Sequence, residues 1–132
     1  MATVELEIPP RSVYVGVVRL AVASLARSAG VDEDVVDDLK IAVSEACANA
    51  VLGLEELGSD EGISIKFTDD GPALVLEVAD RGPGPSDAPV EDSQGFDTRS
   101  AMSTALLRSL VDDCTIASRD GGGTVTVLTL NR

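Results

Sequence analysis

The spacing of apolar residues predicts that strands and helices alternate along the chain. Apolar residues at every second position predict strands over residues 3–8, 63–68, 73–79, 114–118 and 124–130. Three- and four-residue spacing predicts helices over residues 12–29, 32 to about 57, and 100–111. Short glycine-containing turns join the later strands in pairs, which favours antiparallel neighbours. We therefore predict an α+β fold in one domain (1–132), a two-layer sandwich whose helices cover one face of a mainly antiparallel sheet.

Residues 82–99 interrupt this pattern. They contain three prolines, three glycines and few apolar side chains. Such a composition predicts a long loop, and long loops inside compact domains are usually functional.

Each of the first two predicted helices has an apolar face that should be buried. In the first helix these residues are Tyr14, Val18, Val22, Leu25 and Ala29. In the second they are Val35, Leu39, Ala42, Val43, Ala46, Ala50, Leu54 and Leu57. The other side of the first helix carries Arg19, Ala23 and Arg27 at four-residue steps. The two arginines make this row basic. A solvated face explains that row about as well as a docking surface for an acidic partner does.

Charge and histidine content exclude several classes of function. The chain has 23 acidic and 10 basic residues, a net charge of -13, which argues against direct binding to nucleic acid. It contains no histidine, so Ser-His-Asp and Cys-His catalysis are impossible within it. The two cysteines have no metal-binding spacing and are expected to be reduced core residues. With no long apolar stretch and no leader pattern, we expect a cytoplasmic protein that does not enter the membrane.

Two polar residues of the second helix are candidates for chemistry. Glu45 and Asn49 are four residues apart, so they project on the same side of the helix, beside the small-residue stripe. An asparagine offers a neutral oxygen to Mg²⁺, which takes its other ligands from water and phosphates. A glutamate can orient or deprotonate a nucleophile beside a terminal phosphate. Taken alone, the pair is a weak signal, and a solvated helix edge is the favoured interpretation.

The run Asp80-Arg81-Gly82-Pro83-Gly84 adds a second candidate feature. The aspartate ends a predicted strand, where its carboxylate can accept a hydrogen bond from an amine such as the adenine amino group. The glycines allow the backbone to approach a ligand closely. The simpler interpretation is a tight turn in which Asp80 caps backbone NH groups.

Phosphate groups would have few cations to bind. No lysine follows Lys66, so a polyphosphate would depend on Mg²⁺, backbone NH groups and the N-terminus of the helix predicted to start near Ser100. Gly122-Gly123-Thr124 can contribute to the same site or can be only a hairpin turn.

In this order, these motifs resemble the ATPase-like domain shared by histidine kinases, gyrase and the Hsp90 class (the GHKL superfamily, with the Bergerat fold). Within it, the chain is most similar to the bacterial anti-sigma factor serine kinases of the general-stress and sporulation type. The likeness is dense over residues 14–20 and 38–51. It continues more loosely through Asp80-x-Gly82-x-Gly84, residues 110–113 and residues 123–125.

The resemblance implies a role for each matching residue. Glu45 would be the catalytic carboxylate, and Asn49 would bind Mg²⁺ in the motif called the N box. Asp80 would bind the adenine amino group, with Thr124 supporting adenine recognition. Gly82 and Gly84 would shape the nucleotide pocket, and residues 85–99 would form the ATP lid. The family's glycine-rich motif before the third helix would correspond to Ala101-Met102-Ser103, which retains small residues but no glycine.

The resemblance also implies partners. The family uses Mg²⁺ and ATP to phosphorylate a serine or threonine of a STAS-domain anti-anti-sigma protein, and it holds a sigma factor, usually as a homodimer. Arg19 matches an arginine that the family uses against partners, and we place Arg27 on the same surface. The alternative, motivated by Ala101 and Ser103, is a module with weak or no kinase activity that sequesters a sigma factor or STAS protein. An acidic interaction domain unrelated to nucleotides would require the ordered motifs to be a coincidence.

Overall fold

The computed structural model describes residues 2–81, 94–119 and 122–131. Its elements follow the predicted order, and their bounds are as follows. The N-terminal half contains β1 (Ala2–Ile8), a short 3-10 turn (Ser12–Tyr14), α1 (Val15–Ser28) and α2 (Glu33–Leu57). The C-terminal half contains β2 (Ile63–Asp69), β3 (Ala73–Asp80), α3 (Gln94–Leu110), β4 (Asp113–Ser118) and β5 (Thr124–Asn131).

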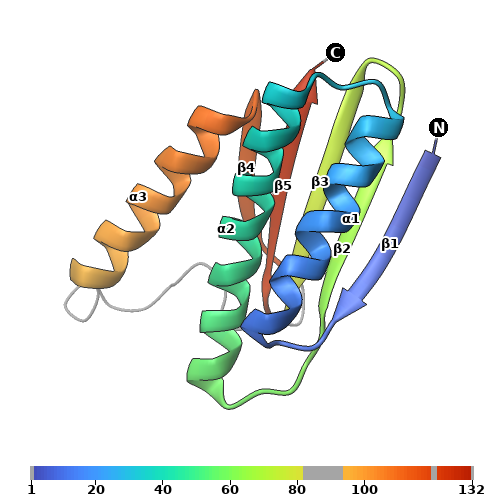
Figure 1. The fold of residues 1–132 in the computed structure, drawn as a ribbon. Helices are drawn as coiled ribbons and strands as arrows, with labels where there is room; N and C mark the ends of the chain where they lie inside the picture. The colour runs from blue at the N-terminus through green and yellow to red at the C-terminus, as the bar shows by residue number, and fades with distance from the viewer. Residues whose placement is uncertain (1, 82–93, 120–121, 132) are drawn as a thin grey trace.

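The strands form one sheet in the order β1-β2-β3-β5-β4, and every neighbouring pair is antiparallel. Helices α1, α2 and α3 lie on the same face of this sheet, with α2 between α1 and α3 (Figure 1). The predicted α+β sandwich is therefore confirmed. Figure 1 also shows that α2 and β3 run toward the same end of the molecule, so residues late in both elements lie at that end.

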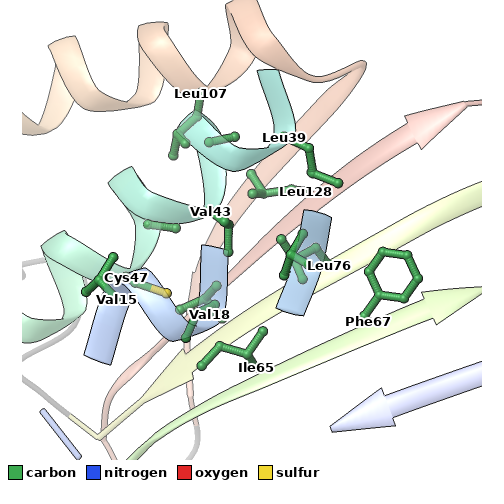
Figure 2. Close-up of a cluster of buried hydrophobic side chains, with 14 of the residues drawn as sticks. Val15, Val18, Leu39, Val43, Cys47, Ile65, Phe67, Leu76, Leu107 and Leu128 are labelled. Carbon is green, nitrogen blue, oxygen red and sulfur yellow. The ribbon is translucent and has the colours of Figure 1, made fainter. Parts of the chain in front are cut away.

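The core fills the space between the helices and the covered face of the sheet. Alternate residues of β2 and β3 point into it, as the strand period requires. Figure 2 shows side chains from α1, α2, α3 and the sheet meeting there, among them Val18, Val43, Leu76, Leu107 and Leu128. Because aromatic residues are scarce, close packing of aliphatic side chains supplies most of the buried apolar surface.

The two cysteines belong to this core. Cys47 and Cys114 are both free thiols and both buried. Desolvation raises the pKa of Cys47 to about 12 and also raises the pKa of Cys114. Both thiols are therefore protonated at neutral pH, which confirms their predicted role as reduced apolar residues.

The buried faces of the helices differ from prediction at a few positions. Tyr14 and Leu57 were expected to be buried, but they are 37% and 57% exposed because each stands next to a helix end, at the margin of the core. Ala23 was placed on the basic outer row, yet it is 2% exposed. The buried face of α1 is thus centred closer to Ala23 than predicted. As a consequence, Arg19 and Arg27 are separated by a core residue and do not form one continuous row.

Helix α3 begins earlier than predicted. Residues 94–99 were assigned to the loop, but the helix starts at Gln94. The last proline before it is Pro89, so only Gly95 opposes helix formation in this segment, at a cost of about 1 kcal/mol. The predicted helix start near Ser100 is therefore wrong, because Ser100 lies inside α3. Of the predicted lid, residues 85–93 are outside the described residues.

Candidate functional site

Helix α2 carries the two candidate polar residues on adjacent parts of its surface. Glu45 is half-buried, and Asn49 is exposed one turn later. The neighbouring Ala42, Ala46 and Ala50 are buried against the core, which fixes the rotation of the helix. Glu45 makes no hydrogen bond or ion pair with any residue that the structure describes. Its carboxylate therefore remains available to an incoming group.

Asn49 contacts helix α3 directly. Its Nδ2 donates a hydrogen bond to Ser103 Oγ over 2.6 Å, and the two residues are 54 positions apart in the chain. Ser103 is 7% exposed, so its hydroxyl is largely removed from water. The structure thus brings together two of the residues predicted for the nucleotide site. Asn49 Oδ1 has no hydrogen-bond partner in the described part of the chain.

The segment Ala101-Met102-Ser103 has an ordinary helical backbone. It lies inside α3, whereas the resemblance placed this motif before the helix. Among the described residues, only glycines have positive φ. Ala101 and Ser103 are therefore unstrained, and both favour a helix more than glycine does.

The end of β3 forms a second part of the site. Asp80 pairs with Thr124 at the start of β5, and both belong to the set of alternate residues that faces the helices. Asp80 is 8% exposed, and Thr124 is partly buried. A carboxylate at this position can accept a hydrogen bond from an amino group.

Two contacts with its backbone carbonyl fix the position of Asp80. Arg119 Nη1 donates a hydrogen bond to the Asp80 carbonyl oxygen over 3.1 Å. Gly123 has a φ of +104° and lies against the same carbonyl, so a Cβ atom there would clash with it and would stand 2.8 Å from Arg81 Cα. Sequence reasoning missed Arg119, because nothing in its local pattern indicates a contact with a residue 39 positions away.

This geometry predicts that Gly123→Ala destabilises the fold. The positive φ and the clash with backbone should lower the free energy of unfolding by about 2 kcal/mol or more. Gly122→Ala is the matched control, because Gly122 also has a positive φ, of +98°, but has open space where a Cβ would stand. It should cost only about 1 kcal/mol. Equal losses for the two variants in urea unfolding would contradict the close approach at Asp80.

A groove on the outer surface of α1 and α2 lies next to Glu45. Its volume is about 740 Å³, and its lining residues are Ser12, Val15, Arg19, Asp37, Lys40, Ile41, Ser44, Glu45 and Ala48. Within it, Arg19 Nε donates a hydrogen bond to Ser44 Oγ over 2.8 Å, and Ser44 Oγ in turn donates to the Lys40 carbonyl over 2.7 Å. The groove therefore places the predicted partner-binding arginine and the predicted catalytic carboxylate along one surface.

Ser44 is a contributor to this groove that sequence reasoning missed. It immediately precedes Glu45, but its contact with Arg19 joins α2 to α1 through two residues that are 25 positions apart. Arg19 is held by a neutral hydroxyl and has no carboxylate partner among the described residues. Its positive charge is therefore available to an anionic group of another molecule.

Arg27 has a different environment. Its Nε forms an ion pair with Glu33 Oε1 over 2.7 Å. The hydrogen bond and the negative charge of Glu33 raise the pKa of the Arg27 guanidinium. Because the chain already balances this charge, Arg27 is a weaker candidate than Arg19 for binding an acidic partner.

Two predicted pocket residues cannot be placed. Gly82 and Gly84 lie outside the described residues.

None of the helices that the structure describes is long and apolar enough to cross a membrane.

Comparisons with known proteins identify the family. Residues 8–130 match the model of the histidine kinase-like ATPase domain. The chain is 30% identical to the serine-protein kinase RsbW of Halalkalibacterium halodurans, over 96% of the chain and 82% of that protein. It is 39% identical to the RsbW of Bacillus subtilis, over 60% of the chain and 49% of that protein.

A solved structure has the same fold. A crystal structure of the RsbU and RsbW domains of a Mycobacterium tuberculosis protein matches with a TM-score of 0.72 at 21% identity, over 99% of the chain and 32% of that protein. The sequence matches show that the chain belongs to the histidine kinase-like ATPase family and, within it, to the RsbW serine-protein kinases. The resemblance predicted from the motifs is confirmed.

Proposed function

We propose that the chain is an Mg-ATP-dependent protein serine/threonine kinase and an anti-sigma factor. Its substrate is a STAS-domain anti-anti-sigma protein, and it controls a sigma factor by exchanging the two partners according to phosphorylation. Membership of the RsbW serine-protein kinases supports the activity. The observation that carries the proposal is the position of Glu45, which is half-buried, has no hydrogen-bond or ion-pair partner among the described residues, and lies on the same groove as Arg19.

The nucleotide would bind between the end of β3 and helices α2 and α3. Asp80 accepts a hydrogen bond from the adenine amino group, and its partial desolvation makes that bond stronger than one at an exposed site. Thr124, its direct neighbour across β3 and β5, supports adenine from the adjacent strand. Gly82 and Gly84 would complete the pocket by close backbone approach.

The residues present fit a magnesium ion that is shared with the nucleotide. Asn49 Oδ1 is a neutral oxygen with no partner among the described residues, and the residue is exposed. In the described residues, no three Asp, Glu or Cys side chains come together as a metal site. We propose that Asn49 would hold Mg²⁺ together with phosphate oxygens and water, and that the ion would neutralise phosphate charge during transfer.

Glu45 would act on the substrate hydroxyl. As the serine oxygen forms its bond to the γ-phosphorus and the bond to the ADP oxygen breaks, the carboxylate accepts the hydroxyl proton. No histidine is needed, which agrees with its absence from the chain.

A transfer assay tests the proposal. The protein is incubated with Mg-ATP and its candidate STAS partner, and phosphate on the partner is measured by mass spectrometry. Transfer supports the kinase, whereas absence of both transfer and a nucleotide-induced rise in melting temperature would leave only the binding module. Ala101 and Ser103, which motivated that alternative, have unstrained helical backbones and give it no further support.

We propose that this chain binds proteins and no nucleic acid. We also propose that it is a homodimer in the cytoplasm. A net charge of -13 disfavours direct contact with nucleic acid. Arg19, fixed by Ser44, presents a local positive charge for a carboxylate of the partner. Arg27 lies on the same helix and contributes less, because Glu33 neutralises it.

Reversal of the charge at Arg19 should weaken partner binding. We expect Arg19→Glu to reduce affinity for the STAS partner by at least about tenfold, because it replaces an attractive charge pair with a repulsive one. Arg108→Glu is the matched control, because it makes the same charge change in the last turn of α3, away from the groove. Isothermal titration calorimetry measures both affinities. Equal affinities for the two variants would exclude Arg19 from the interface.

A further inference from the structure

We propose that Ser103 is a positioning residue that orients the side-chain amide of Asn49 so that Oδ1 faces the magnesium ion of the bound nucleotide. This role rests on the proposed function of Asn49 as a magnesium ligand. It assigns a purpose to the hydroxyl group that this chain carries where the family pattern has glycine.

The hydrogen bond has the properties that positioning requires. The distance from Asn49 Nδ2 to Ser103 Oγ is 2.6 Å, and the serine is 7% exposed. Water therefore competes poorly for the hydroxyl, and burial without a partner would cost free energy. The contact also joins α2 to α3, so the amide is held by a helix other than its own.

The hydrogen bond uses the amide nitrogen of Asn49 and leaves the amide oxygen for a metal ion. The last torsion of an asparagine side chain has broad preferences, so a free amide rotates and presents either nitrogen or oxygen. Only the oxygen can bind Mg²⁺. When the nitrogen donates to Ser103, the oxygen points to the opposite side of the amide. In the structure the serine hydroxyl accepts from Asn49 Nδ2, so this contact holds the amide in the orientation in which Oδ1 can bind a metal ion.

Glycine at position 103 would lack this interaction. The helical backbone at Ser103 does not require glycine, because no described residue other than glycine has a positive φ. The serine therefore adds a side-chain hydrogen bond without backbone strain. An amide oriented in advance loses less entropy when the metal binds, which strengthens binding.

The test compares the ATP affinity of each variant with magnesium and with EDTA, by titration calorimetry. The magnesium effect is the ratio of the two affinities. We expect both Ser103→Ala and Ser103→Gly to reduce this ratio by about fivefold, the effect of one net hydrogen bond, and to leave affinity in EDTA unchanged. Ser109→Ala is the matched control on the same helix, because Ser109 donates only to the Leu106 carbonyl. It should keep the full ratio.

A second measurement does not depend on nucleotide. In the free protein, nuclear magnetic resonance should show that the side-chain NH₂ signals of Asn49 shift in Ser103→Ala and stay in place in Ser109→Ala. Melting temperatures of all variants establish that they fold.

Each failure has a distinct meaning. A full magnesium effect in Ser103→Ala would overturn the positioning role and leave the metal role of Asn49 intact. A loss in Ser103→Ala together with a full effect in Ser103→Gly would also overturn it, since both lack the hydroxyl. If the unchanged protein binds ATP equally with magnesium and EDTA, the proposed metal role of Asn49 fails, and the positioning role fails with it.

Discussion

Glu45→Gln should reduce phosphoryl transfer to the STAS partner by about 10²- to 10⁴-fold, the usual contribution of a general base. Glutamine has nearly the same shape but cannot accept a proton at neutral pH. Because Glu45 has no partner among the described residues, its replacement breaks no contact and should not change the melting temperature. Single-turnover transfer of labelled phosphate measures the rate.

A matched control separates catalysis from charge. Glu55→Gln makes the same change on the exposed surface of the same helix, near its C-terminal end. It should transfer phosphate at the rate of the unchanged protein. ATP affinity should be unaffected by Glu45→Gln, because the proposed role concerns the substrate hydroxyl. A transfer rate within about threefold of the unchanged protein would remove Glu45 from the general-base role, for which the expected loss is far larger.

Asp80→Ala should weaken ATP binding by about 10- to 100-fold, since it removes a hydrogen bond between a carboxylate and the adenine amino group. The effect should be large because Asp80 is 8% exposed, so water cannot easily replace the lost carboxylate. Recognition of the amino group also predicts selectivity. Inosine triphosphate has a carbonyl at that position and should bind weakly to the unchanged protein.

The comparison of the two nucleotides provides the decisive readout. Asp80→Ala should bind ATP and inosine triphosphate with similar affinity, because the group that distinguishes them is gone. Glu77→Ala is the matched control, because it removes a carboxylate from the same strand on the face that the helices do not cover. It should keep the preference for ATP. A preference that persists in Asp80→Ala would show that another group reads the adenine.

Local patterns predicted most of the elements. Alternation of apolar residues locates all five strands to within one or two residues, because the side chains of a strand have a period of two. Glycines follow two helix ends, Gly30 after α1 and Gly58 after α2, both with positive φ. The start of α3 was missed, because loop-like composition outweighed the absence of proline after Pro89.

The sequence by itself made Glu45, Asn49 and Asp80 candidates, because helical spacing and the end of a predicted strand are local signals. It also determined that any chemistry must proceed without histidine. Tertiary structure alone decided how these residues are supported. The contacts of Asn49 with Ser103, of Arg19 with Ser44 and of Gly123 with Asp80 join positions 25 to 54 residues apart. Such contacts depend on how helices pack side by side and which strands pair, and no periodicity within one segment contains that information.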